Sequence, residues 1–260
     1  MAYALVTGAS GGIGLSLAHA LAKRKVDVLL VARSADKLQL AAADIQEKYQ
    51  VKAAFLALDL SLSGSSQVVK DWVTKNGFSV NILVNNAGYG LWGTFDEMPW
   101  PQLANMMQLN MVAMAELCHT MIPELKRNGP SYVMNIASTA AYQAVPTLAT
   151  YAATKSFVVL FSRGLRMELR GSGISVTCVS PGATATQFVE RAGMSNDLKQ
   201  KAEKFSMSAD DVARVAINGM FNRKAEVVPG FVNWLSVQFT YLLPKLIPEA
   251  IAASLYKEKV

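Results

Sequence analysis

The feature that most constrains this chain is a glycine loop between a short apolar strand and a helical pattern near the N-terminus. Residues 3–7 (YALVT) are apolar and partly β-branched, which predicts a buried strand. Gly8, Gly12 and Gly14 follow, and apolar residues then recur at helical spacing through Leu21. Glycines let a turn adopt positive φ and let a ligand approach the backbone. Because a helix N-terminus offers N–H groups to a phosphate, the segment predicts a pyrophosphate site.

Strand patterns alternate with helical patterns along the rest of the chain. Further strands are expected over residues 26–31, 51–58, 80–84, 132–136 and 174–179. Such alternation favours a parallel sheet with helices on both faces. No linker or repeat interrupts it, so we expect a single domain over residues 1–260, an α/β Rossmann-like doubly wound parallel sheet in three layers (α/β/α).

A second enzyme class also fits the glycine loop. Residues 8–12 (GASGG) match the G-x-S-x-G turn that carries the nucleophile of α/β-hydrolases. That chemistry needs a histidine base late in the chain, whereas the only histidines are His19 and His119. Only one strand precedes Ser10, and a nucleophile turn belongs on a central strand. The hydrolase interpretation is therefore disfavoured, although the glycine spacing also departs from the usual G-x-G-x-x-G.

The end of the second predicted strand indicates which dinucleotide would bind. About 20 residues past the loop, an acidic residue would suit the ribose 2′-hydroxyl of NAD, and an arginine the 2′-phosphate of NADP. This chain has Ala32, Arg33 and Ser34 there. Arg33 therefore predicts NADP(H) in preference to NAD(H); the structural alternative is a surface arginine that opens a helix over residues 34–49.

Tyr151 and Lys155 lie near the start of a helical pattern that runs to about residue 170. In a helix, residues four apart share a face. A phenol alone has a pKa near ~10, and a neighbouring cation lowers it. The pair could then exchange a proton with a carbonyl or alcohol oxygen near neutrality. Because Tyr-x-x-x-Lys is also common on solvated helix faces, the interpretation needs support elsewhere.

Polar residues that follow other strands supply that support. Ser138 follows the fifth strand, and its hydroxyl could donate to the same carbonyl oxygen. The turn over residues 85–88 (NNAG) lies where doubly wound sheets bind ligands, though it also suits a plain tight turn. Asn110 falls inside a long helical pattern over residues 101–126, where asparagine is a poor helix former.

Together these motifs resemble the short-chain dehydrogenase/reductase family in its compact form. The resemblance extends from residue 3 to about residue 228 and rests on Thr7-Gly8-x-x-x-Gly12-Ile13-Gly14, Asp59, Asn85-Asn86-Ala87-Gly88, Asn110, Ser138, Tyr151-x-x-x-Lys155 and Pro181-Gly182. Each motif alone is weak, whereas all of them in this order are specific. The family implies NADP(H)-dependent reduction of a ketone or aldehyde to an alcohol, or the reverse, by hydride transfer. The alternative is a non-catalytic nucleotide-binding or scaffold protein on the same fold.

The resemblance also implies roles for the matching positions. Tyr151 would be the general acid in reduction, Lys155 would hold the nicotinamide ribose and lower the Tyr151 pKa, and Ser138 would orient the carbonyl. Asn110 would hold a water that links Lys155 to solvent. Cofactor contacts would come from Gly8, Ser10, Gly12, Ile13, Gly14, Arg33, Asp59, Asn86, Ala87, Gly88, Tyr151, Lys155, Pro181, Gly182, Thr184 and Thr186. The family further implies a homodimer or homotetramer paired through residues 101–126 and 151–170.

Composition excludes some partners. The net charge is +6, but no run of four basic residues occurs, so no nucleic-acid partner is expected. The only cysteines, Cys118 and Cys178, lie in apolar segments, and no signal segment is recognised, which favours a reducing, cytoplasmic location. Cys118 and His119 lack metal-ligand spacing, so no metal is expected.

Substrate choice would fall to residues 88–101, 140–150 and a lid at about 183–207. These segments supply Tyr89, Trp92, Tyr142 and Phe188, which predict an apolar carbonyl or alcohol substrate. An apolar C-terminal extension covers about residues 229–260. We expect it to pack on the core or cover the pocket; peripheral membrane contact is less favoured, and a spanning helix least.

Overall fold

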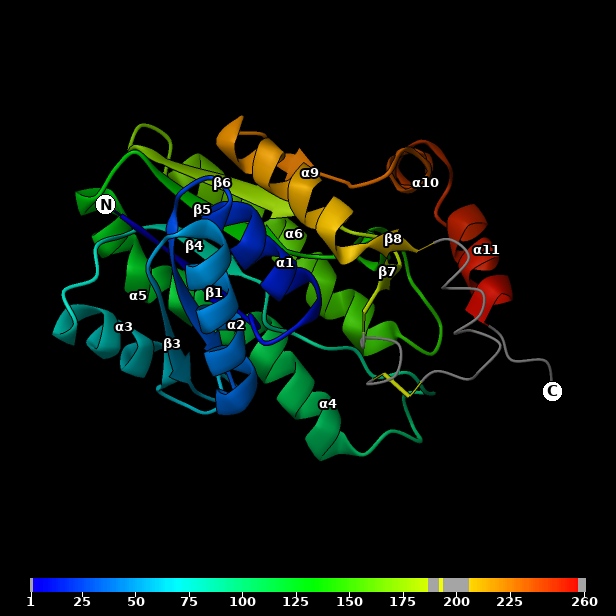
Figure 1. Cartoon of the computed structure of the whole chain (residues 1–260). Helices are drawn as coiled ribbons and strands as arrows, with labels where there is room; N and C mark the ends of the chain where they lie inside the picture. The colour runs from blue at the N-terminus through cyan, green and yellow to red at the C-terminus, as the bar shows by residue number, and fades with distance from the viewer. Residues whose placement is uncertain (1, 187–191, 194–205, 257–260) are drawn as a thin grey trace.

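A parallel sheet of seven strands forms the centre of the computed structural model, which describes residues 2–186, 192–193 and 206–256. The strand order is β3-β2-β1-β4-β5-β6-β9 (Figure 1). The strands are β1 (Tyr3–Thr7), β2 (Asp27–Ala32), β3 (Ala53–Ala57), β4 (Val80–Asn85), β5 (Ser131–Ile136), β6 (Ile174–Val179) and β9 (Glu226–Val227). The predicted doubly wound α/β fold is confirmed, with each predicted strand displaced by at most two residues at either end.

Helices cover both faces of the sheet and complete the three layers (Figure 1). One layer holds α1 (Gly12–Ala22), α2 (Ala35–Tyr49) and α9 (Ala209–Phe221), and the other holds α3 (Ser65–Lys75), α5 (Met114–Arg127) and α6 (Ala149–Glu168). Leu5 of β1 packs in the core under α3, α5 and α6, whereas its neighbours Ala4 and Val6 pack on the side of α1, α2 and α9. Strands buried on both faces require the near-continuous apolar sequence seen here.

The sheet reverses its strand order between β1 and β4, which pair directly. Thr7, the last residue of β1, joins the ends of these strands. Its Oγ1 donates to the Val84 carbonyl (3.2 Å) and accepts from the backbone N–H groups of Asn86 (2.9 Å) and Ala87 (3.0 Å). The glycine loop and the turn after β4 therefore lie side by side at the switch point, where such sheets bind ligands.

The helix expected over residues 101–126 is interrupted. It consists of α4 (Trp100–Met107), a π-helical turn (Gln108–Ala113) and α5. Asn110 lies in the π turn, which resolves its poor fit to a regular α-helix. Periodicity did not predict this interruption, because apolar residues continue through it.

Several short elements were also not predicted. Strand β9 has two residues, and so do β7 (Thr184–Ala185) and β8 (Met207–Ser208), which pair with each other. Two residues are too few for an alternation signal. Most of the expected lid lies outside the described residues, which lack 187–191 and 194–205.

The C-terminal extension forms two helices, α10 (Phe231–Leu242) and α11 (Leu246–Tyr256). They lie at one end of the molecule, beyond α9 (Figure 1). Helix α10 packs against a 3₁₀ turn, η2 (Thr139–Tyr142), that follows β5. Among the described residues, no helix combines the length and apolarity needed to cross a membrane.

Candidate active site

A cavity of about 1310 Å³ lies at the carboxyl ends of the strands, beside the switch point. Most of the predicted site residues line it: Gly8, Ser10, Gly12, Ile13, Arg33, Asp59, Asn86, Ala87, Gly88, Ser138, Tyr151, Lys155, Pro181, Gly182, Thr184 and Thr186. Asn110 and Gly14 are the predicted residues that do not. The fold thus gathers these predicted residues, which lie up to 178 positions apart in sequence, around one space.

The glycine loop forms one part of the cavity wall. Gly8 and Gly12 have φ angles of 67° and 54°, which side-chain-bearing residues rarely adopt. Helix α1 begins at Gly12, and no side chain of the described residues caps its N-terminus at Gly11. The first-turn N–H groups of α1 are therefore left for a ligand, and the helix dipole favours an anion there.

Gly14 acts through packing. A Cβ atom on Gly14 would lie 2.3 Å from the Gly8 carbonyl oxygen and 2.4 Å from Asn86 Nδ2. Asn86 Nδ2 in turn donates to the Thr7 carbonyl (3.0 Å). The missing side chain at Gly14 thus lets α1 press against the glycine loop and the turn after β4.

We expect Gly14→Ala to lower the free energy of unfolding by about 2 kcal/mol, because overpacking a closed site costs roughly 1–3 kcal/mol. The matched control is Gly11→Ala, where the backbone is extended (φ 172°). Apart from Gly11 and its chain neighbours, the described residues place no atom within 4 Å of the added methyl. Chemical denaturation of both variants makes the comparison. Equal stability of the two would contradict the packing role of Gly14.

Tyr151 and Lys155 are both buried, one turn apart on α6, and line the cavity. Lys155 Nζ donates to the Ile136 carbonyl at the end of β5 (3.0 Å) and lies 5.9 Å from the centre of the Tyr151 ring. Ser138 lies two residues after Ile136. Its Oγ accepts a hydrogen bond from the Ala140 N–H (3.1 Å) and thereby caps η2. The Ser138 hydroxyl hydrogen is thus directed away from that bond.

Burial dominates the electrostatics of Lys155. It lowers the pKa of the ammonium from 10.5 to about 8, with a small opposing effect from Cys178. Desolvation disfavours the charged form of a buried lysine. The amine can therefore gain or lose a proton in the pH range where enzymes work.

Asn110 connects three parts of the site. Its Oδ1 accepts from the Tyr89 N–H (3.1 Å), and its Nδ2 donates to the Tyr89 carbonyl (2.9 Å) and to Thr154 Oγ1 (3.1 Å). Thr154 Oγ1 donates to the Tyr151 carbonyl (2.7 Å). The π turn, the loop after β4 and α6 are thereby joined. Nothing in the sequence had given Thr154 a role, although it lies three residues after Tyr151.

Because Gly88 has no side chain, the turn after β4 can pack closely against Asn110 and Lys155. A Cβ atom there would lie 2.9 Å from Asn110 Oδ1 and 3.4 Å from Lys155 Nζ. The turn after β4 therefore passes directly over both side chains, which a larger residue would push apart.

Arg33 and Asp59 face each other at another part of the cavity. The Arg33 side chain is 71% exposed, and its Nη1 lies 3.9 Å from Asp59 Oδ2. Burial raises the pKa of Asp59, but hydrogen bonds from Ser61 and the charge of Arg33 outweigh it and bring the pKa below its usual range. The loose contact leaves the guanidinium able to bind an anionic group.

The α10 helix contributes Ser236, Val237 and Thr240 to the cavity wall. Of the aromatic residues predicted to contact a substrate, Tyr89 lines the cavity, whereas Trp92 and Tyr142 do not. Phe188 lies outside the described residues. Periodicity had marked the extension as apolar without showing which residues of it turn toward the site.

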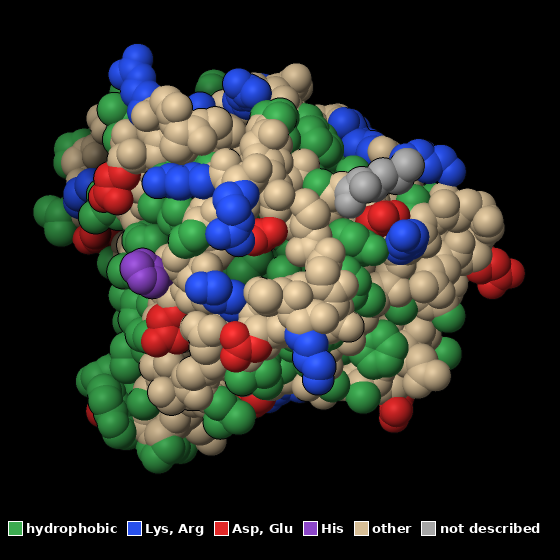
Figure 2. Space-filling model, turned by 90° about the vertical axis from the view of Figure 1, so that its left-hand side faces the viewer, with side chains coloured by type: hydrophobic (Ala, Val, Ile, Leu, Met, Phe, Trp, Pro, Cys, Tyr) green, Lys and Arg blue, Asp and Glu red, His purple; other side chains and the backbone are tan. Residues whose placement is uncertain are grey.

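The positions of the histidines and of the possible metal ligands do not support hydrolase or metal chemistry. His19 and His119 are absent from the cavity wall, and His19 lies beside Asp44 (3.7 Å). Within the described ranges, no group of three His, Cys, Asp or Glu side chains could hold a metal ion. On the face drawn in Figure 2, basic side chains are interspersed with acidic and apolar ones.

The fold and this cavity define a nucleotide-binding α/β protein of the doubly wound class. The family model described as short chain dehydrogenase matches residues 2–197. The chain belongs to the short-chain dehydrogenase/reductase family of oxidoreductases.

Individual relatives agree with this assignment. Hydroxysteroid dehydrogenase-like protein 1 of Gallus gallus is 31% identical over 96% of this chain and 73% of its own length. Very-long-chain 3-oxoacyl-CoA reductase of Rattus norvegicus is 33% identical over 80% of this chain and 67% of its own length. The structure of a short-chain dehydrogenase from Sphingobium yanoikuyae in complex with NADPH has a TM-score of 0.82 and 29% identity, and covers 93% of this chain and 94% of that one.

Proposed function

We propose that this protein is an NADP(H)-dependent oxidoreductase that reduces the carbonyl group of an apolar small molecule to an alcohol, or catalyses the reverse reaction. The observation that carries the proposal is the shared cavity, in which Ser138, Tyr151 and Lys155 lie with the glycine loop. A neighbour of this fold binds NADPH, according to its description.

The residues present fit a dinucleotide phosphate. Gly8 and Gly12 form a bare backbone cradle beside the uncapped N-terminus of α1, which suits a pyrophosphate. Arg33 and Ser10 line the cavity and suit a 2′-phosphate, while Asp59 and the turn Asn86–Gly88 suit the adenosine. When bound, the cofactor supplies or accepts the hydride.

The chain's own residues would manage the proton and the orientation. Ser138 would donate to the carbonyl oxygen, and Tyr151 would deliver the proton to that oxygen. Lys155, a cation one turn from Tyr151, would favour the phenolate form left behind and would bind ribose hydroxyls. Asn110 would hold a water that links Lys155 to solvent. Pro181, Gly182, Thr184 and Thr186, which line the cavity, would border the nicotinamide.

Apolar lining indicates the substrate class. Leu91, Val145, Leu148 and Val237 all line the cavity. Burial of apolar surface would reward a ligand with a large hydrocarbon part. The names of two relatives, one hydroxysteroid dehydrogenase-like and one acting on very-long-chain 3-oxoacyl-CoA, point the same way. We therefore propose a ketone or aldehyde with a bulky apolar group.

The assembly and the cellular location are also proposals. Phe157, Leu160 and Met167 expose apolar side chains on α6, which suits pairing of two copies through α4, α5 and α6. A homodimer or homotetramer built this way would leave the cavity residues in place. Both cysteines are free, buried thiols, which suits a reducing compartment such as the cytoplasm.

Titration with NADPH and NADH, followed by nicotinamide fluorescence, tests the cofactor. Micromolar NADPH binding with much weaker NADH binding would support the proposal, and a panel of apolar ketones would then be screened with NADPH. Tight binding of both cofactors with no turnover of any carbonyl would favour the alternative, a non-catalytic nucleotide-binding or scaffold protein.

We expect Arg33→Asp to weaken NADPH binding by about 10-fold or more and to favour NADH, because a carboxylate repels the 2′-phosphate and accepts a 2′-hydroxyl. Lys48→Asp on α2 is the matched control, since it makes the same charge change at an exposed position outside the cavity wall. Dissociation constants for both cofactors decide the matter. An unchanged NADPH-to-NADH ratio in Arg33→Asp would refute this role.

A further inference from the structure

The outward sides of α10 and α11 carry large exposed apolar side chains, which together we call the tail surface. Its most exposed members are Phe231, Val232, Leu242 and Leu246. Trp234, Phe239 and Ile251 extend it along both helices. An apolar surface of this kind on a water-soluble domain marks a contact site.

Helix α10 exposes apolar side chains on its outward side, although its inward side is itself partly polar. Its buried residues are Val237 and Thr240, and the half-buried Asn233 donates to the Pro229 carbonyl (2.8 Å). Its exposed side presents Phe231, Leu235 and Leu242, at helical spacing. These apolar side chains are exposed to solvent in the isolated chain, so we infer that a partner covers this side of α10.

Charge and length indicate a lipid surface as the cover. No Asp, Glu, Lys or Arg occurs from Val227 to Pro244. Lys245 then stands exposed between the two helices, with Nζ donating to the Thr240 carbonyl (3.1 Å), and Glu249 is the one charged residue within α11. The helices have 12 and 11 residues, too short to span a bilayer but suited to lie in its interface. The chain's net charge of +6 adds attraction to anionic headgroups.

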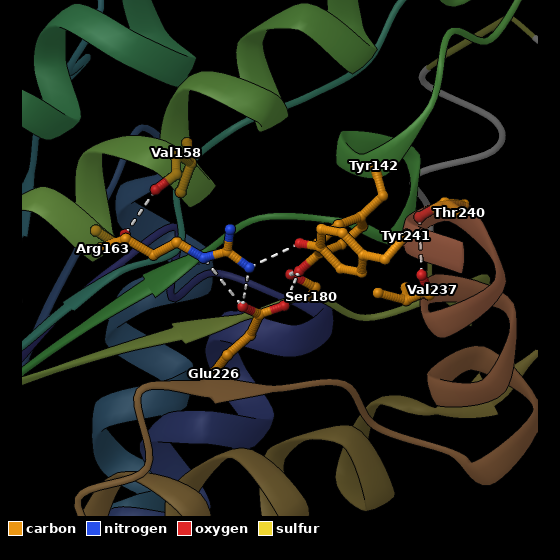
Figure 3. Close-up of polar contacts among 9 residues, drawn as sticks. Tyr142, Val158, Arg163, Ser180, Glu226, Val237, Thr240 and Tyr241 are labelled. Carbon is orange, nitrogen blue, oxygen red and sulfur yellow. Dashed lines mark hydrogen bonds and ion pairs between the residues drawn. The ribbon is translucent and has the colours of Figure 1, made fainter. Parts of the chain in front are cut away.

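A network of polar contacts joins α10 to α6, β9 and η2 (Figure 3). Arg163 of α6 donates to Glu226 Oε2 (2.7 Å) and to the Tyr241 hydroxyl of α10 (2.7 Å). Tyr142 donates to Glu226 Oε1 (2.6 Å), and its hydroxyl also contacts Ser180 (2.7 Å). The tail surface is thereby held in a set orientation to the ends of β5 and β6.

Two members of the network, Arg163 and Tyr142, keep their protons near neutral pH. The hydrogen bond to Glu226 raises the pKa of Arg163, so the guanidinium stays protonated. Burial and the contact with Glu226 raise the pKa of Tyr142, so its hydroxyl stays a donor. Both residues should therefore remain hydrogen-bond donors at the near-neutral pH of a docking experiment.

A second copy of the chain is the competing occupant. Phe157, Leu160 and Met167 on α6 already offer an apolar surface for pairing, on a different element. Lipid contact would also bring the cavity close to the bilayer, because Ser236, Val237 and Thr240 of α10 line the cavity. An apolar ligand could then pass between the lipid and the cavity along α10.

We propose that the tail surface docks this protein on an anionic lipid bilayer. Phe231, Trp234 and Leu242 enter the headgroup region, and Lys245 meets the anionic headgroups. The α10 wall of the cavity then lies next to the lipid. Docking does not depend on the proposed reaction, so either can fail alone.

Co-sedimentation with vesicles tests the proposal. We expect the full-length protein to bind vesicles of phosphatidylcholine mixed with phosphatidylglycerol, and to bind phosphatidylcholine vesicles less. Leu242→Ser with Leu246→Ser, which changes side chains 78% and 80% exposed, should reduce the bound fraction by about 10-fold or more. The matched control, Leu40→Ser with Leu62→Ser, changes side chains 72% and 60% exposed elsewhere and should bind like the wild type.

Three results would overturn docking. One is a wild-type protein that does not co-sediment with either kind of vesicle. Another is equal vesicle binding by the wild type and the Leu242→Ser, Leu246→Ser protein. The third is conversion of that variant to a smaller oligomer while the wild type does not bind vesicles, which would assign the tail surface to a second copy.

Tryptophan quenching gives a readout that keeps the tail surface apolar. Lipids brominated on the acyl chains should quench the fluorescence of the wild type and of Trp100→Phe, which removes an exposed tryptophan on α4. In Trp234→Phe, vesicle binding should persist and most of the quenching should be lost. Quenching that survives in Trp234→Phe would place the contact away from the tail surface and refute the proposal.

Discussion

Tyr151→Phe is expected to reduce kcat/KM for carbonyl reduction by about 1,000-fold or more, equivalent to about 4 kcal/mol of transition-state stabilisation. The substitution removes only the hydroxyl proposed to deliver the proton. Tyr151 is buried on α6, and a phenylalanine ring fills the same space. The dissociation constant for NADPH should therefore change by about two-fold at most.

The control for this variant is Tyr142→Phe. Tyr142 is also buried and follows Ser138 closely, but its hydroxyl contacts Ser180 and Glu226 and does not line the cavity. We expect its kcat/KM to fall by about 10-fold at most, since the lost hydroxyl belongs to the hydrogen-bond network that holds α10 and does not line the cavity. Steady-state kinetics with the best ketone of the panel measure both. Wild-type turnover in Tyr151→Phe would end the proposed mechanism.

Much of the site was predictable because its parts have local signals. The glycine loop between a strand and a helix predicts a phosphate cradle, and the Tyr151 and Lys155 spacing predicts a shared helix face. Parallel strands then bring the ends of β1, β4 and β5 to one edge of the sheet. Ser138 and the turn after β4 follow from that arrangement alone.

Other parts depend on contacts between distant residues. Arg163 and Glu226 are 63 residues apart, and no pattern in either segment indicates their pairing. The π turn at Asn110 is accompanied by hydrogen bonds to the Tyr89 backbone, 21 residues away. Apolar periodicity cannot tell an inward helix face from an outward one, so the exposed apolar side of α10 is visible only in three dimensions.

Lys155→Met should make the protein more stable near neutral pH while it abolishes turnover. Burial lowers the pKa of Lys155 from 10.5 to about 8. Below pH 8 the amine is charged in both states, so the folded state bears the full desolvation cost, about 3 kcal/mol at 1.36 kcal/mol per pKa unit. Methionine removes that cost and loses the hydrogen bond to the Ile136 carbonyl, worth about 1 kcal/mol.

The pKa of Lys155 also sets how the stability difference between Lys155→Met and the wild type changes with pH. Between about pH 8 and 10.5 the unfolded wild type binds more protons than the folded one, so the wild type gains stability as the pH rises. We therefore expect Lys155→Met to exceed the wild type by about 2 kcal/mol near pH 7. The difference should fall to zero near about pH 10 and then reverse slightly, because only the lost hydrogen bond remains.

Urea denaturation at several pH values measures that gap, with Lys75→Met as the control. Lys75 is exposed on α3, so its substitution should change stability by about 0.5 kcal/mol or less at any pH. A Lys155→Met protein less stable than the wild type at pH 7 would mean that the buried ammonium stabilises the fold. The expected outcome is the reverse: a buried cation weakens the fold, and the chain retains it because the proposed reaction uses it.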